Sequence, residues 1–203
     1  MATMDEFALA LFETPRFPVR RFTVEEYQKL GEIGLLTEDD HVELIEGWIV
    51  PKMNRNPPHD ATIEIIQDWL VGVLPKGWRH RVQSGMVTRD SQPEPDIVVV
   101  RGDPRERRNR HPNPNDLALV IEVADSSLLF DRDDKARLYA RERVPCYWIV
   151  NLIDKQIEVL TDPTGPRRKP VFHKQEIFQF DDEVSLMIEG KFVARAPVAS
   201  LLV

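Results

Sequence analysis

Cysteine is nearly absent from this chain of 203 residues, which contains Cys146 alone. An intramolecular disulfide is therefore impossible, and a zinc site built from several cysteines cannot form. The chain also lacks an apolar run close to the roughly 20 residues that cross a bilayer, and its N-terminal stretch has no basic start before an apolar segment. We therefore expect neither a membrane segment nor a secretory signal, and we predict a reducing, cytoplasmic compartment.

An excess of positive charge is lacking as well, because the net charge is −7. Proteins that coat nucleic acid gain affinity by releasing counterions from phosphates, and an acidic surface opposes this. One basic segment departs from the pattern, and it includes Arg105, Arg107 and Arg108. Alone, such a segment is more typical of a solvated loop, but beside an acidic site it could hold a phosphate backbone.

The length and composition favour one folded domain, with 42% hydrophobic and 30% charged residues. Residues 1–20 contain two prolines and show no sustained periodicity, so we predict a flexible arm there and a single domain over residues 21–203. Thr23 and Glu26 have the spacing of a capping box, which predicts the start of a helix.

Two further elements are predicted before residue 75. The segment from His41 to Val50 has the pattern of a hairpin that turns at Glu46-Gly47. Pro57-Pro58 then begins a helix, because proline is tolerated in the first turn and apolar residues follow at helical spacing. His59 lies at the N-terminal end of the apolar face of that helix.

The rest of the chain predicts a mixed sheet. Short β-branched runs predict buried strands at 97–100, 117–124 and 146–152, with another strand at 79–89 and a helix at 131–143 that Asp131 can cap. Shorter strands are predicted at 156–160, 177–180, 184–188 and 191–194. A strand, helix and strand in succession imply one parallel pair. The predicted class is therefore α/β (α+β): a mixed sheet flanked by helices, with an N-terminal hairpin and a β-rich C-terminal tail.

Two carboxylates suggest chemistry at one end of this sheet. Glu122 interrupts an apolar strand, where a buried charge is costly unless something pairs with it. A salt bridge to an arginine would be a purely structural explanation of equal weight. Asp96, however, stands directly before a neighbouring buried strand, and two nearby acids favour a divalent cation. Oxygen ligands suit Mg²⁺ or Mn²⁺.

Lys135 is the third candidate residue. It shares a helical stripe with Leu138 and Tyr139, which we expect to face the core, so we expect Lys135 to lean inward. A solvated lysine is the usual case on a helix surface, but this stripe favours a role in the site.

These residues resemble the catalytic pattern of the PD-(D/E)XK nucleases, and the wider sequence resembles the Uma2 family, a restriction-endonuclease-like group. The matching segments, in order, are Glu43-Leu44-Ile45-Glu46-Gly47, Pro57-Pro58-His59, Pro95-Asp96-Ile97-Val98-Val99-Val100, Leu119-Val120-Ile121-Glu122-Val123 and Asp131 to Asn151. The resemblance implies a restriction-endonuclease-like core and metal-dependent hydrolysis of DNA. Asp96, Glu122 and the Val123 carbonyl would bind Mg²⁺ or Mn²⁺, and Lys135 would act on the attacking water.

The sequence departs from the broad nuclease pattern in two places. Ala124 stands where the pattern has lysine, and Ala124-Asp125-Ser126-Ser127 replaces the Ser-Pro-Ser of the family. Uma2 proteins resemble this chain in having the lysine on the following helix, which fits Lys135. Glu43 matches a family acid that would complete the site, although Glu46 is near enough for the same role. His59 would be accessory, or only a histidine at a helix start.

Two other functions stay open at this stage. The chain could be a catalytically silent DNA- or protein-binding module, as its net charge and Ala124 suggest. It could also be a glycosidase with two acids, but its tryptophans lie in core-like patterns, which makes this a distant third. The resemblance implies DNA as the partner and a homodimer as the assembly to test.

Overall fold

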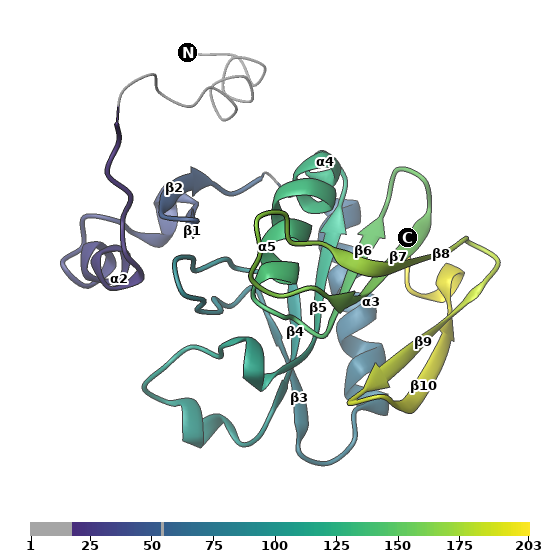
Figure 1. Cartoon of the computed structure of the whole chain (residues 1–203). Helices are drawn as coiled ribbons and strands as arrows, with labels where there is room; N and C mark the ends of the chain where they lie inside the picture. Colours follow the sequence, from purple (N-terminus) through teal and green to yellow (C-terminus); the bar gives the residue numbers. More distant parts are fainter. Residues whose placement is uncertain (1–17, 54) are drawn as a thin grey trace. The chain divides into compact units, whose positions relative to one another are not determined.

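A computed structural model of the chain describes residues 18–53 and 55–203, which form helices and mixed β-sheet (Figure 1). The described chain divides into two compact units. The smaller unit contains residues 18–52 and 89–92, and the larger unit contains residues 53, 55–88 and 93–203. Most of the predicted N-terminal arm falls on residues 1–17, outside the described residues.

The smaller unit begins with helix α2 (Val24–Glu32), which confirms the predicted capping box. The Thr23 side chain accepts a hydrogen bond from the Glu26 amide, and the Glu26 carboxylate accepts one from the Thr23 amide. A short 3₁₀ turn, η1 (Glu38–Asp40), follows α2.

The predicted hairpin is confirmed as antiparallel strands β1 (Val42–Ile45) and β2 (Trp48–Pro51). Glu46 and Gly47 form its turn with φ values of 49° and 78°. A Cβ at Gly47 would lie 2.9 Å from the Phe22 carbonyl oxygen, so glycine suits both the turn and the close chain approach.

The larger unit is built on a six-stranded sheet with the order β3-β4-β5-β6-β7-β8. Its strands are β3 (Trp78–Val82), β4 (Ile97–Arg101), β5 (Leu117–Ala124), β6 (Cys146–Asn151), β7 (Gln156–Pro163) and β8 (Phe172–Phe178). β5 and β6 are parallel and the other neighbouring pairs are antiparallel. The predicted mixed sheet and its parallel crossover are confirmed.

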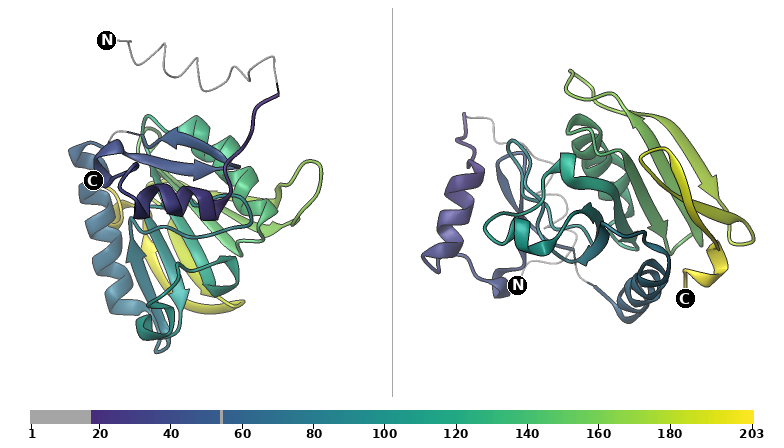
Figure 2. Two further views of the ribbon diagram at one scale, coloured as in Figure 1. Left: turned by 90° about the vertical axis from the view of Figure 1, so that its left-hand side faces the viewer. Right: turned by 90° about the horizontal axis from the view of Figure 1, so that it is seen from below.

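Different helices pack on the two faces of this sheet (Figure 2). Helix α3 (Pro57–Val73) buries Ile63, Ile66 and Leu70 in one core with the strand residues Ile121 and Trp148. The hairpin of β9 (Glu183–Ile188) and β10 (Lys191–Pro197) contributes to the same core.

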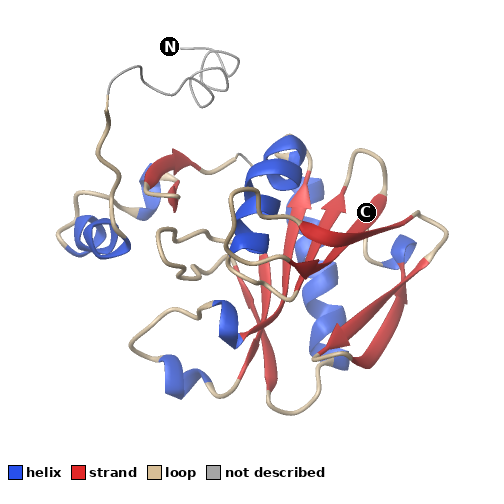
Figure 3. Ribbon diagram, in the orientation of Figure 1, coloured by secondary structure: helices blue, strands red, loops and turns tan. Residues whose placement is uncertain are grey.

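A helical segment between β5 and β6 covers the other face. It runs through α4 (Leu128–Phe130), the π-helical turn η4 (Asp131–Lys135) and α5 (Ala136–Arg141). Short 3₁₀ turns η2 (Pro104–Arg107), η3 (Pro114–Asp116) and η5 (Val198–Ser200) occupy the connections and the C-terminal end (Figure 3). No helix in the described ranges is long and apolar enough to cross a membrane.

The structure differs from the sequence prediction at several boundaries: β7 and β10 each continue three residues beyond their predicted ends, and three other elements differ in ways that bear on the site or on the sheet edge. The strand predicted over 79–89 ends at Val82, because Gln83 has a φ of 46° and leaves the extended conformation. The strand predicted over 177–180 is instead β8, which begins at Phe172. The helix predicted to start at Asp131 begins at Leu128, so Asp131 lies inside it and does not cap it.

Candidate active site

Strands β4 and β5 bring Asp96 and Glu122 together. Ile97 is paired with Ile121 in the antiparallel register, so Asp96, one residue earlier, lies beside the Glu122–Val123 segment. The Val123 amide donates a hydrogen bond of 2.8 Å to Asp96 Oδ2, and the Asp96 amide lies 3.4 Å from Glu122 Oε2. Both side chains are buried.

Glu122 is contacted by two side chains from the helix that crosses over the sheet. Lys135 Nζ donates to Glu122 Oε1 at 2.9 Å, and the Tyr139 hydroxyl donates to the same oxygen at 2.7 Å. Lys135 Nζ also lies 3.7 Å from Asp131 Oδ1. The inward position predicted for Lys135 is therefore what the structure shows, since the residue is only 8% exposed.

The π-helical turn accounts for this arrangement. π-helical turns are rare, occur mostly as single insertions in α-helices and are frequent at functional sites. Here the turn spans Asp131 to Lys135, and both end residues are buried. Asp131 Oδ2 accepts a hydrogen bond of 2.6 Å from the Ser127 hydroxyl, and the Asp131 carbonyl accepts one of 3.2 Å from Tyr147. These bonds hold the turn over the carboxylates.

The electrostatic balance of the cluster is unfavourable to a further negative charge. Burial raises the pKa of Glu122 to about 8, and the charges of Asp96 and Asp131 add to the rise although Lys135 opposes it. A buried carboxylate with such a pKa gains from any additional cation beside it.

His59 approaches the cluster from the start of α3. The Asn56 side chain caps this helix by accepting a hydrogen bond of 3.0 Å from the His59 amide. His59 Nε2 lies 3.2 Å from Asp96 Oδ2, and Nδ1 lies 3.3 Å from Asp60 Oδ1. Burial is the largest influence and lowers the pKa of His59, but the bonds to Asp96 and Asp60 together leave it raised.

The donor atoms suit a hard cation with few protein ligands. In residues 18–53 and 55–203 no three His, Cys, Asp or Glu side chains gather as a ready metal cage. Mg²⁺, however, is commonly held by one or two carboxylates and keeps several waters. Asp96 Oδ1 accepts no hydrogen bond from the described residues.

The main-chain oxygen of Val123 lies on the edge of β5 that faces β4, where Asp96 also lies. The Ala124 carbonyl accepts a hydrogen bond from Leu152 beyond β6, so it points toward β6. Successive carbonyls alternate along a strand, and the Val123 carbonyl therefore points toward the β4 side, as its amide does. The two carboxylates and this carbonyl thus fit Mg²⁺ or Mn²⁺.

Comparison with known proteins identifies the family. A family model named Uma2 and described as "Putative restriction endonuclease" matches residues 24–194. The chain belongs to the Uma2 family. The Uma2 chain also resembles the crystal structure of "a putative nuclease belonging to DUF820" from Anabaena variabilis ATCC 29413, with a TM-score of 0.62 and 18% identity. The match covers 89% of this chain and 97% of the other. At that identity the likeness establishes the fold. The curated proteins contain no match.

The other predicted site residues belong to two further segments of the Uma2 chain. Glu43 lies on β1 and Glu46 in the following turn, both in the smaller unit. Arg107 lies near Arg101, at the opposite end of β4 from Asp96, because its guanidinium donates to the Arg101 carbonyl. Arg105 and Arg108 belong to the same loop, and the Arg105 side chain is 91% exposed. The structure does not bring these arginines to the carboxylates.

Two members of the cluster were not predicted as site residues. Tyr139 was expected to pack in the core, and its hydroxyl instead bonds to Glu122. Asp131 was expected to cap a helix, and it is buried beside Lys135. The spacing of Tyr139, four residues after Lys135, was the available signal for a shared face. No sequence pattern we considered indicated the π-helical turn.

Proposed function

We propose that this Uma2 protein is a Mg²⁺- or Mn²⁺-dependent endonuclease that hydrolyses phosphodiester bonds of DNA. The observation that supports this most is the pairing of Asp96 and Glu122 across β4 and β5, with Lys135 bonded to Glu122. Two carboxylates and a lysine at the end of a mixed sheet supply the groups for metal-assisted hydrolysis.

A bound divalent cation would lower the pKa of a water and neutralise charge on the phosphate oxygens. Asp96, Glu122 and the Val123 carbonyl would hold it. Lys135 would release its hydrogen bond to Glu122 in part and use its ammonium protons to orient the attacking water or the phosphate oxygen.

Other residues of the cluster would position these groups. Tyr139 would keep Glu122 Oε1 in place through its 2.7 Å hydrogen bond. His59 would fix the Asp96 carboxylate from the side of α3. The further acid that the family resemblance implies, Glu43 or Glu46, stays a prediction.

The segment that contains Arg105, Arg107 and Arg108 would contact the DNA backbone away from the bond that is cut. Asp96 and Arg101 are five steps apart along this extended segment, so their main chains lie about 17 Å apart, which corresponds to about five base pairs of duplex. Burial and then the charge of Arg107 lower the pKa of Arg81 on β3, so two guanidinium groups lie close enough to repel. A phosphate would relieve that repulsion, and Arg105 and Arg108 extend the same basic surface.

The alternative is a nuclease-fold module that binds DNA or protein without cutting. Two observations favour it: the net charge of −7, and the alanine at position 124 where the broad nuclease pattern has lysine. In that case Lys135 would serve only to neutralise Glu122.

The two functions are separated by incubating the protein with supercoiled plasmid and with single-stranded DNA, in Mn²⁺, Mg²⁺ or a chelator. Asp96→Asn is the test variant. Asp68→Asn on the exposed side of α3 is the matched control, since it removes the same charge away from the site. We expect metal-dependent cleavage by wild type and control, and none by Asp96→Asn.

DNA binding without cleavage by wild type would support the silent module. Equal cleavage by Asp96→Asn would show that the site lies elsewhere. Metal binding measured by calorimetry on the same proteins tests the ligand assignment separately from activity.

A further inference from the structure

Strand β8 forms an edge of the six-stranded sheet. It is last in the strand order, and in the described part of the chain no strand pairs with its outer side. Residues 173–177 are all exposed, although the strand is regular and keeps register with β7 from Lys174 to Phe178. A regular open edge offers unpaired main-chain donors and acceptors to another strand.

The charges on β8 change sign about its centre. Lys174 precedes Gln175 and Glu176 follows it. Neither charged side chain has an ion-pair partner in the ranges that the structure describes. Single-sign charges on an edge strand discourage pairing between copies, but charges of opposite sign around a centre favour it.

Antiparallel self-pairing permits few registers, because a two-fold axis must pass through one residue of the strand. An axis at Lys174 or at Glu176 would place like charges directly opposite each other. An axis at Gln175 places Lys174 opposite Glu176 of a second copy, twice in each pair. It also places Phe172 opposite Phe178, and both ends of β8 are then paired.

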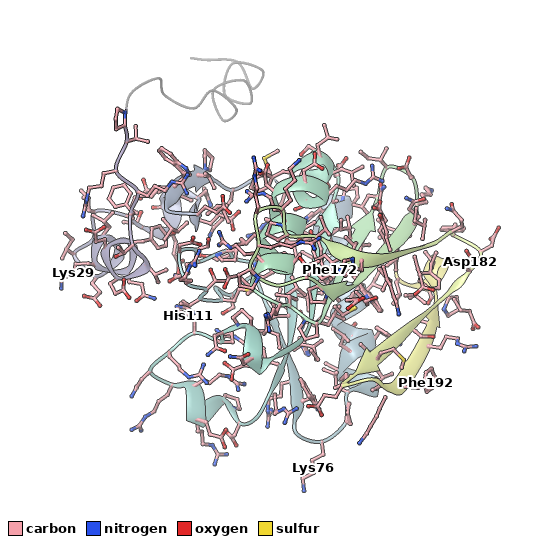
Figure 4. The ribbon with its side chains drawn as sticks, in the orientation of Figure 1. Lys29, Lys76, His111, Phe172, Asp182 and Phe192 are labelled. Carbon is pink, nitrogen blue, oxygen red and sulfur yellow. The ribbon has the colours of Figure 1, made fainter. Side chains whose placement is uncertain are left out.

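The segments beyond β8 extend the same charge pattern. Arg167, Arg168 and Lys169 precede the strand, and Asp181, Asp182 and Glu183 follow it, at equal distances in sequence from Gln175. All six side chains are exposed. Figure 4 labels Phe172, the first residue of β8, and Asp182, in the turn that follows the strand.

In an antiparallel pair centred on Gln175, the basic end of each copy meets the acidic end of the other. Exposed apolar side chains also flank the edge, among them Val171, Ile177 and Phe180. Such a surface is complementary to itself, which is the requirement for a symmetric dimer.

We propose that two copies of this chain associate through their β8 edges in antiparallel register about Gln175, so that the two six-stranded sheets become continuous. The partner is a second copy because charge, register and both ends of the strand are matched by the same sequence. This interface does not depend on whether the protein cleaves DNA.

Sedimentation velocity over a concentration series tests the proposal with charge-reversed variants. Lys174→Glu and Glu176→Lys each create two like-charge pairs in the dimer, and we expect each to weaken self-association about 10-fold or more. An equimolar mixture of the two variants restores opposite charges in a heterodimer, so we expect association close to wild type. Lys76→Glu, on an exposed loop after α3, is the matched control and should associate as wild type does.

The loop residues provide a second pair of variants outside the strand. Arg168→Glu and Asp182→Arg should each weaken the dimer and should likewise complement one another in a mixture, while circular dichroism checks that each is folded. A wild-type monomer at every concentration would overturn the proposal. So would a dimer that neither reversal weakens, or a mixture of weakened variants that fails to associate.

Discussion

The substitution Glu122→Gln tests the electrostatics of the site most directly, because it removes a buried charge and keeps the size of the side chain. In the wild type, burial raises the pKa of Glu122 from 4.5 to about 8. At a pH between these two pKa values, the Glu122 carboxyl is protonated in the folded state but has lost its proton in the unfolded state. The folded state therefore binds more protons, and its stability falls as pH rises from about 4.5 to about 8.

The size of this loss follows from the same shift. At 1.36 kcal/mol for each pH unit, the interval corresponds to about 5 kcal/mol as an upper figure. In Glu122→Gln this titration is absent, and Lys135 keeps Asp131 as a neighbour at 3.7 Å. We therefore expect the variant to match wild type within about 1 kcal/mol near pH 5 and to be more stable by a few kcal/mol near pH 8.5.

The assay is urea unfolding followed by tryptophan fluorescence, with a chelator present, at several pH values. The difference between the two proteins isolates Glu122, because the other titrating groups are common to both. Adding Mn²⁺ should restore the wild-type stability at high pH and leave Glu122→Gln unchanged. If the free energy of unfolding depends on pH equally in the two proteins, the argument that Glu122 has a raised pKa in the folded state is refuted.

Further predictions concern neighbouring residues. Lys135→Met should retain fold and Mn²⁺ binding but reduce metal-dependent cleavage about 100-fold, with Lys76→Met as control; full activity would make Lys135 a structural residue. Asp96→Asn should lower the pKa of His59, because Asp96 helps to raise it; an unmoved NMR titration would contradict the contact. Thr62 Oγ1 is buried without a hydrogen-bond partner in the described part of the chain, so Thr62→Val should raise the free energy of unfolding by about 1 kcal/mol. A loss of stability would reveal a hidden partner.

Much of the fold could be predicted because its signals are local. The β-branched runs at 97–100 and 117–124 gave strands, since such side chains pack on both faces of a buried sheet. The capping box at Thr23 and the prolines at Pro57-Pro58 gave helix starts within a residue or two. Each of these signals lies within the element that it predicts.

The features that were missed depend on partners far away in sequence. Residues 173–176 of β8 are polar and show no apolar alternation, because both faces of this strand are exposed, so its start at Phe172 was not predicted. Tyr139 looked like a core residue, and only the tertiary structure places its hydroxyl on Glu122. The position of Asp131 depends on a π-helical turn for which we found no sequence signal.

The strand order has a consequence for how this protein folds. β3, β4 and β5 are consecutive antiparallel strands, and so are β6, β7 and β8, so each trio can form from contacts that are close along the chain. The parallel contact between β5 and β6 joins the trios and closes a longer loop through the crossover helix. Asp96 and Glu122 belong to the first trio, whereas Lys135 is carried by that helix. The cluster of Asp96, Glu122 and Lys135 is therefore complete only when the crossover helix has packed on the sheet, and a partly folded chain would hold its carboxylates without their lysine.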